Sequence, residues 1–194
     1  MGKQDLLDAV VDNLQREGIG DRSLRDIAGS VGTSHRMLIH HFGSRQGLLT
    51  EVVRRVEDDQ RRFLASLDAT PDEMARTMWE RLADPAVRPA ERLFFECYAR
   101  AARGEEPYAS LLPGLVTDWL DRLASMGPAA ADPDRARAQA RLALALFRGL
   151  LLDLVGTEDR AGVDAAFEEF LALQRIAIER GRAPTRRRTR SATA

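Results

Sequence analysis

The stretch SLRDIAGSVGTSHRMLIHHFGSR, residues 23–45, decides the fold of this chain. Its first half has apolar side chains at positions i, i+3, i+4 and i+7, which predicts a short helix with one buried face; they are Leu24, Ile27, Ala28 and Val31. Ser23 and Asp26 have the spacing of a capping box that starts this helix. Gly32 follows the last apolar position, where a glycine ends a helix by adopting left-handed backbone angles. We therefore expect a helix that stops at a tight turn.

A second short helix is predicted directly after this turn. Thr33 and Ser34 offer hydroxyl caps for its first backbone N–H groups. Leu38 and Phe42 are four residues apart, so both side chains would pack back on the first helix, and Gly43 ends the segment. Two short helices joined in this way form a helix-turn-helix, which places its second helix in the major groove of DNA.

The outward face of this second helix is cationic and polar. With Leu38 placed inward on a helical wheel, Arg36 and His40 point outward. The flanking positions are held by Met37 and Ile39 on the two sides, and by His35 and His41 nearer the buried edge. Residues 32–45 include arginines and histidines but no acidic residue, in a chain that has 30 acidic residues in total. This local charge attracts phosphate, so we expect the surface to bind DNA.

The start of the next helix adds to this surface. Ser44 caps that helix, so its free backbone N–H groups and the Arg45 guanidinium lie beside the same face and form a ready site for a phosphate. A metal site is not expected, because His35, His40 and His41 lack the i, i+4 spacing of ligands on one helical face. For His41, packing in the core and a phosphate contact both remain open.

The stretch resembles the N-terminal domain of the tetracycline-repressor (TetR) family of bacterial transcription regulators. The resemblance covers roughly residues 3–55 and includes a preceding apolar helix that ends at Gly18, the glycine turn at Gly32, and HHFGS at residues 40–44. It implies that the following residues face DNA: Thr33, Ser34, His35, Arg36, Met37, Ile39, His40, His41 and Arg45. The position of Ile39 is commonly a phosphate-binding tyrosine in the family, so we expect Ile39 to contact a sugar or a thymine methyl group instead.

Composition restricts the class of protein. The chain has 194 residues, of which 44% are hydrophobic and 30% charged, as in globular proteins. It has no apolar run of membrane-spanning length and begins MGKQDLLDAV, without a signal-peptide core, so we expect a cytoplasmic protein that contacts no membrane. Cys97 is the single cysteine and is interpreted as a small core residue. No enzyme motif is present, so we expect neither catalysis nor a cofactor.

The remainder of the chain also has helical periodicity. Helices are predicted at 44–67, from 70 to about 84, at 89–103, at 107–126 with Pro113 inside, at 133–155, and from 157 or 159 to 180. No strand pattern appears, so the fold class is all-α. We expect three parts, which are a helix-turn-helix DNA-binding domain at 1–45, a helical ligand-binding and dimerisation domain at 46–181, and a disordered basic tail at 182–194 that has five arginines and no acid.

The last two predicted helices have more apolar surface than one core requires. Residues 142–154 are apolar on several faces, and the final helix is also rich in leucine, isoleucine and phenylalanine. Two such helices paired with their twofold copies form a four-helix bundle, and the resemblance implies the same dimer. The residues predicted to form the interface are Leu152, Phe167, Phe170 and Leu171. The alternative is that these faces pack only against the core of one chain.

The resemblance also implies a small-molecule pocket among the middle helices. Aromatic and methionine side chains suit an adaptable apolar site, and the candidates are Met78, Trp79, Phe94, Tyr98, Leu115, Trp119 and Phe147. The same residue types also form ordinary cores. No charged cluster in the sequence indicates an anionic ligand, so we expect a small apolar effector.

These features together predict a homodimeric repressor that binds a palindromic double-stranded DNA operator and is released by the effector. Two other roles remain open, which are an activator and a regulator that binds DNA without any ligand. A helical interaction module that does not bind DNA is disfavoured by the acid-free face of the second helix.

Overall fold

The computed structural model describes residues 2–18, 20–126 and 132–182, and side chains as far as residue 176. These residues form helices and contain no strand, so the all-α fold class is confirmed. The helices are α1 (Lys3–Glu17), α2 (Leu24–Ser30), α3 (His35–Phe42), α4 (Arg45–Ser66), α5 (Pro71–Leu82), α6 (Arg88–Ala102), α7 (Asp118–Met126), α8 (Pro133–Thr157) and α9 (Arg160–Arg182). Shorter turns lie at η1 (Pro85–Val87), η2 (Tyr108–Leu111) and η3 (Pro113–Thr117).

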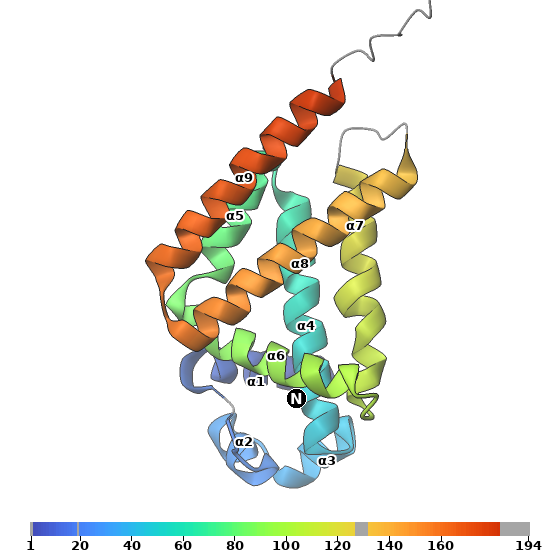
Figure 1. The fold of residues 1–194 in the computed structure, drawn as a ribbon. Helices are drawn as coiled ribbons and strands as arrows, with labels where there is room; N and C mark the ends of the chain where they lie inside the picture. The colour runs from blue at the N-terminus through green and yellow to red at the C-terminus, as the bar shows by residue number, and fades with distance from the viewer. Residues whose placement is uncertain (1, 19, 127–131, 183–194) are drawn as a thin grey trace, which may run out of the picture. The chain divides into compact units, whose positions relative to one another are not determined.

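The helix-turn-helix forms where the sequence predicts it. The hydroxyl group of Ser23 accepts a hydrogen bond from the backbone N–H of Asp26, whose carboxylate accepts one from the backbone of Ser23 in return, so the predicted capping box is present. Gly32 has φ +67°, the left-handed conformation that the turn requires. Ser34 caps α3, and Ser44 caps α4. Figure 1 shows α2 and α3 side by side at the N-terminal end of α4.

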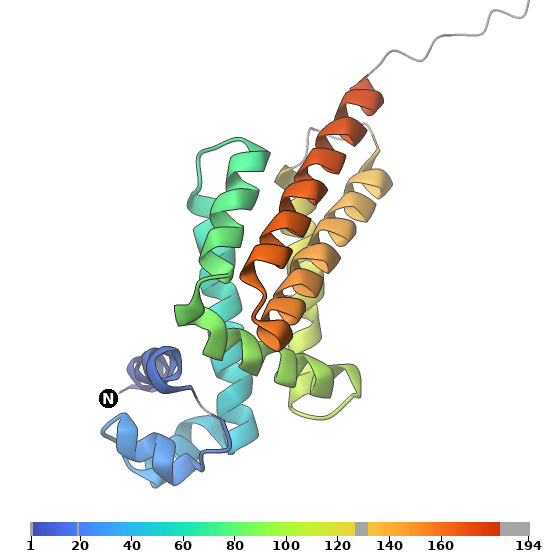
Figure 2. The same cartoon turned by 60° about the vertical axis from the view of Figure 1, so that its left-hand side comes forward.

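Helix α6 connects the N-terminal helices to the rest of the protein. It contacts α1, α4, α8 and η2, and in Figures 1 and 2 it lies across the middle of α4. The buried apolar side chains form a continuous cluster that runs from α1 through α3 and α4 into α6 and η3, as illustrated by Leu6, Leu38, Val52, Phe94 and Leu115. The helix-turn-helix and α6 therefore share one core.

Helix boundaries beyond α4 differ from the predictions by small amounts. The predicted helix around Pro113 is interrupted, with the 3-10 turn η2 and the π-helical turn η3 before α7, because a proline inside a helix removes a backbone hydrogen bond. Helix α8 continues through Gly156 to Thr157, and α9 begins at Arg160, one residue later than expected. The predicted loop at 127–131 and the tail at 183–194 lie outside the described residues.

The described residues up to Glu158 form one compact unit, and a second unit starts at Asp159. The predicted functional division at residue 45 does not coincide with a break in the core, since α4 follows α3 after two residues and packs against both α3 and α6. That division remains a prediction about function.

Candidate nucleic-acid interface and effector site

Helix α3 uses only two of its eight residues for packing. Leu38 and Phe42 are buried. The other side chains that sequence reasoning placed toward DNA are exposed, namely Ser34, His35, Arg36, Met37, Ile39 and His40. This face contains no acidic residue, and the apolar Met37 and Ile39 are 36% and 39% exposed. A helix surface with free donors and exposed apolar groups can contact base edges, phosphates and thymine methyl groups together.

The remaining predicted DNA-facing residues are half-buried. Thr33 lies in the turn, and its backbone N–H donates to the carbonyl of Ala28. Ser44 accepts a hydrogen bond from the backbone of Gly47 and so acts as a cap. His41 has a buried Nε2 atom without a hydrogen-bond partner among the described residues. A buried polar atom without a partner costs free energy. This observation does not decide between core packing and a phosphate contact for His41.

Arg45 has a structural role that the sequence did not predict. Its Nε donates to the backbone carbonyl of Arg22 at 2.8 Å, and its Nη2 donates to the carbonyl of Gly20. These bonds tie the loop between α1 and α2 to the start of α4. The guanidinium therefore also supports the fold, which the sequence could not show because its partners are backbone atoms more than 20 residues earlier; its predicted contact with DNA remains a prediction.

Arg22 forms a second internal tie that sequence reasoning missed. Its Nη1 donates to the buried Asn13 at 2.9 Å and to the carbonyl of Gly18, and its Nη2 contacts Ser30. The side chain of Asn13 is 2% exposed, so Arg22 satisfies a polar group that would otherwise be buried alone. Together with Arg45, Arg22 fixes the position of α2 relative to α1 and α4.

The seven predicted pocket residues do not enclose one common cavity. Trp79 contacts Phe147 edge to face, with ring centroids 6.1 Å apart. Phe94 and Tyr98 lie 5.8 Å apart, whereas Met78 and Leu115 are buried. Only Phe94 lines the small cavity between α4 and α6, which has a volume of about 10 Å³. This volume is close to that needed for a single water molecule, so the cavity is closed in this structure.

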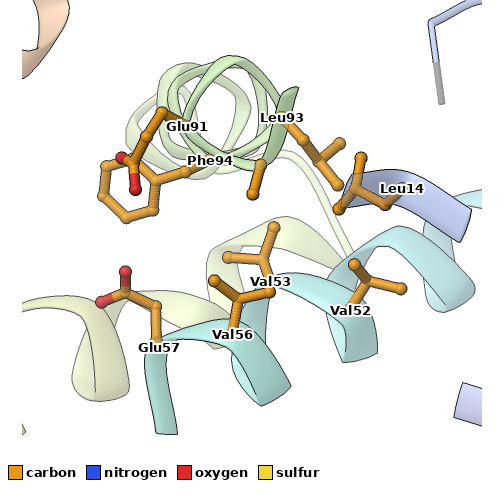
Figure 3. Close-up of a pocket in the computed structure, with 9 residues that line it drawn as sticks. Leu14, Val52, Val53, Val56, Glu57, Glu91, Leu93 and Phe94 are labelled. Atoms are coloured by element: carbon orange, nitrogen blue, oxygen red, sulfur yellow. The ribbon is translucent and has the colours of Figure 1, made fainter. Parts of the chain in front are cut away.

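Two carboxylic acids that sequence reasoning missed line this cavity. Glu57 on α4 and Glu91 on α6 are 7% and 6% exposed, and Figure 3 shows their carboxyl groups pointing toward one another. Oε2 of Glu57 accepts a hydrogen bond from Nε1 of Trp119 at 2.6 Å. Oε1 of Glu91 accepts one from the side-chain amide of Gln60 at 3.3 Å.

Burial controls the protonation of this pair. Desolvation and, to a smaller extent, the charge of Glu57 raise the pKa of Glu91 to about 8. Desolvation also raises the pKa of Glu57, although the hydrogen bond from Trp119 and the charge of Arg148 oppose it. Burial therefore favours the protonated form of both carboxyl groups.

Arg148 supplies the positive charge of the cluster. Its guanidinium lies 5.2 Å from the ring centroid of Phe94 and 5.3 Å from that of Tyr98, and Nη2 donates to the carbonyl of Leu115. Burial lowers the pKa of Arg148, and the charge of Glu57 opposes this. A signal for the cluster existed in the sequence, because Glu57 follows Val53 by four residues and so lies on the apolar stripe of α4.

The predicted dimer residues divide between covered and exposed positions. Phe167, Phe170 and Leu171 are at most 9% exposed in the single chain. Leu152 is 54% exposed. Sequence patterns could not separate these cases, because α9 is apolar on the covered positions as well as on the exposed ones.

Comparison with known proteins identifies the N-terminal helices. Residues 3–52 match the family model described as bacterial regulatory proteins, tetR family. This segment contains the capped helix-turn-helix and the exposed face of α3. The N-terminal helices therefore match the DNA-binding segment of the TetR family. This match agrees with the helix-turn-helix that the sequence predicts for these residues.

Solved structures share the fold over most of the chain. A transcriptional regulator from Rhodococcus sp. Rha1 is 20% identical, with a TM-score of 0.72 over 89% of this chain and 95% of that one. A TetR-family transcriptional regulator from Pectobacterium atrosepticum is 20% identical, with a TM-score of 0.64 over 89% and 91%. A TetR variant from Acinetobacter baumannii AYE in complex with minocycline is 18% identical, with a TM-score of 0.60 over 95% and 99%. No curated protein matches the chain.

The two remaining predictions concern Cys97 and membrane-spanning helices. Burial raises the pKa of the Cys97 thiol to about 12, so this side chain remains a protonated core group. None of the helices within the described residues is both long enough and apolar enough to span a bilayer.

Proposed function

We propose that this protein is a homodimeric repressor of the TetR family that binds a palindromic operator through α3 and is released by a small-molecule effector. One observation carries the proposal. The large hydrophobic side chains that are exposed in the described residues lie on three helices, which are α3 (Met37 and Ile39), α8 (Leu142 and Leu152) and α9 (Leu173 and Ile176). Exposed apolar groups that gather in this way mark contact surfaces. We assign α3 to DNA and the other two helices to the second subunit.

The dimer surface has a regular spacing on each helix. Exposed apolar and small residues on α8 alternate at intervals of four and three, and they are Ala138, Leu142, Ala145, Gly149, Leu152 and Gly156. A similar exposed series on α9 comprises Gly162, Ala166, Glu169, Leu173 and Ile176. A repeat of seven residues keeps one seam of a helix facing a partner helix, and small side chains allow close approach. This spacing supports a twofold bundle of α8, α9 and their copies.

Twofold symmetry determines the expected DNA site. A dimer places two α3 helices in successive major grooves, so the half-sites should be about one helical turn apart or a multiple of that distance. The effector part of the proposal is supported by the minocycline complex of the Acinetobacter relative, which has the same fold. It is also supported by the cavity between α4 and α6, because α4 starts two residues after α3 ends.

The central experiment measures operator binding by Arg36→Ala. A palindromic site is first selected from random duplex DNA, and affinity is then measured at several salt concentrations. Loss of one base contact costs about 1–3 kcal/mol and relaxes one position of the site, whereas loss of a phosphate contact weakens all sequences alike and lowers the salt slope. The control is Arg62→Ala, since Arg62 is 66% exposed near the other end of α4. Unchanged binding by Arg36→Ala would remove this side chain from the DNA-binding surface.

Repression and release are tested with the selected site placed in a promoter. We expect the protein to lower reporter expression, and a fall in expression on deletion of the regulator would show activation instead.

A further inference from the structure

The exposed face of α3 carries polar and apolar side chains in a fixed order. Arg36 and His40 are four residues apart, so they form one polar ridge on the side of the helix opposite the buried Leu38. Met37 follows Arg36 by one residue and so lies about 100° around the helix. Ile39 precedes His40 by one residue and lies about 100° in the other direction. The two apolar side chains therefore occupy opposite flanks of the polar ridge.

Both flanking side chains are large, apolar and exposed. Met37 is 36% exposed and Ile39 is 39% exposed. Apolar groups gain free energy when a binding partner removes them from water. Helix α3 contains no acidic residue, and the ridge between the two flanks carries the positive charge of Arg36. This charge suits the negative surface of DNA, so the partner that covers these side chains is a DNA groove.

The chemistry of the major groove limits what these two side chains can contact there. The C5 methyl group of thymine is the apolar group on the base edges, and the other groups are hydrogen-bond donors and acceptors. Isoleucine has no polar side-chain atom, and the methionine sulfur is only a weak acceptor. A thymine methyl group lies on the side of the groove bordered by its own strand. When the ridge of a helix points to the floor of the groove, its two flanks face the two strands.

We propose that Met37 and Ile39 contact thymine methyl groups on opposite strands of each operator half-site, while the ridge of Arg36 and His40 faces the base pairs. This inference rests on the proposed function and gives the operator a required feature. Each half-site must have a thymine on both strands, so either strand alone contains a thymine and an adenine within the half-site. The flanks of α3 thus determine sequence specificity together with the ridge.

The first test replaces thymine with deoxyuridine, which lacks the methyl group and keeps the hydrogen bonds of the base pair. A palindromic operator is selected from random duplex DNA with the full chain, and each thymine of the half-site is then replaced in turn. A palindrome repeats each thymine in both half-sites, so one replacement removes two methyl groups. The affinity should fall about four- to sixteenfold at two thymines, one on each strand. Unchanged affinity at every thymine, or a half-site with thymines on one strand only, overturns the proposal.

The second test assigns each methyl group to one side chain. Met37→Ala should abolish the loss at one thymine and keep the loss at the other, and Ile39→Ala should give the reverse pattern. Each variant is therefore the control for the other. Arg62→Ala, at a 66% exposed position near the far end of α4, should keep both losses. Melting temperatures without DNA check that the variants are folded.

Two results of this second test would contradict the assignment. One is a sensitivity to deoxyuridine that both Met37→Ala and Ile39→Ala retain in full at every thymine, because the methyl groups would then contact other side chains. The other is a loss that both variants abolish at thymines of the same strand, because the two flanks would then not face opposite strands. Either result overturns the proposal.

The selection step separates this inference from the proposed function. A protein that enriches no duplex contradicts DNA binding, and the inference fails with it. A protein that enriches a palindrome but tolerates deoxyuridine at every thymine contradicts only the methyl contacts, and the proposed function stands.

Discussion

Gly47 shows how closely α3 and α4 approach one another. A Cβ atom at this position would lie 2.1 Å from the backbone carbonyl oxygen of Phe42, the last residue of α3. That oxygen also accepts a hydrogen bond from the backbone of Ser44, so it is fixed by the turn. The helix interior at residue 47 can therefore hold only glycine, although glycine normally weakens a helix.

We predict that Gly47→Ala destabilises the protein by about 1–3 kcal/mol, because the added methyl group meets backbone rather than a flexible side chain. The control is Gly29→Ala in α2, where nothing lies within 4 Å of the added Cβ. This control should be neutral or should raise stability by up to about 1 kcal/mol. Urea unfolding measures both, and a Gly47→Ala protein as stable as the wild type would show that the α3–α4 turn is looser than the structure indicates.

Substitutions of Arg36 in α3 and of Arg45 at the start of α4 should separate effects on stability from effects on DNA binding. Arg45→Gln removes donors to the carbonyls of Gly20 and Arg22, so we predict a lower melting temperature in the absence of DNA. Arg36→Ala removes an exposed side chain and should lower operator affinity while the melting temperature stays within error of the wild type. Thermal unfolding without DNA decides the case of Arg45. An unchanged melting temperature of Arg45→Gln would contradict a structural role for this side chain and leave its predicted contact with DNA.

At the scale of helices, most of the fold could be predicted from local patterns. The capping boxes at Ser23 and Thr70 and the Asp132 cap of α8 are present because each depends on residues only three apart. The sequence could not show partners that are far apart in the chain. Glu57 appears within a charged run, and only its position on the buried face of α4 distinguishes it from its exposed neighbour Asp58.

The α4–α6 contact should make stability depend on pH. The folded pKa of Glu91 is raised to about 8, above the value of 4.5 expected when the chain is unfolded. Between these two values the folded state binds more protons than the unfolded state, so stability is highest at the acidic end and falls as pH rises, by up to about 1.4 kcal/mol per unit. Above the folded pKa the loss is complete.

We predict that Glu91→Gln removes most of this slope, because the amide does not titrate. Urea unfolding at intervals between about pH 5 and 8.5 measures it, and Glu96→Gln on the exposed face of α6 serves as the reference. A wild-type protein whose stability rises across this interval would contradict the protonated state of Glu91.

At the scale of the whole molecule, the structure changes the choice of residues for testing the dimer. Substituting Phe167 or Leu171 by a charged residue would disturb packing within one chain, since each is 2% exposed. Loss of dimer and loss of fold would then be confused. Leu142 and Leu152 are 63% and 54% exposed, so these two positions test association alone.

We predict that Leu142→Glu with Leu152→Glu yields a folded monomer that has lost specific operator affinity, because one short reading helix contacts too few bases alone. Gln139→Glu, at an exposed position of α8 outside the heptad stripe, should remain dimeric. Sedimentation gives the molecular mass, and circular dichroism checks the helices. A wild-type monomer at micromolar concentration, or a double variant that still sediments as a dimer, would remove the α8 and α9 surface from the interface.

The sparse packing of α3 has a consequence for how operators can diverge. Leu38 and Phe42 alone hold the helix in the core, and the five exposed positions at residues 35, 36, 37, 39 and 40 contribute little to folding. If α3 binds the operator as proposed, mutations there should change the DNA sequence that is bound with little effect on stability, so copies of the gene could acquire new binding sites without first gaining stabilising substitutions. A library randomised at these five positions should therefore yield mostly folded proteins, among which regulators for chosen operators can be selected.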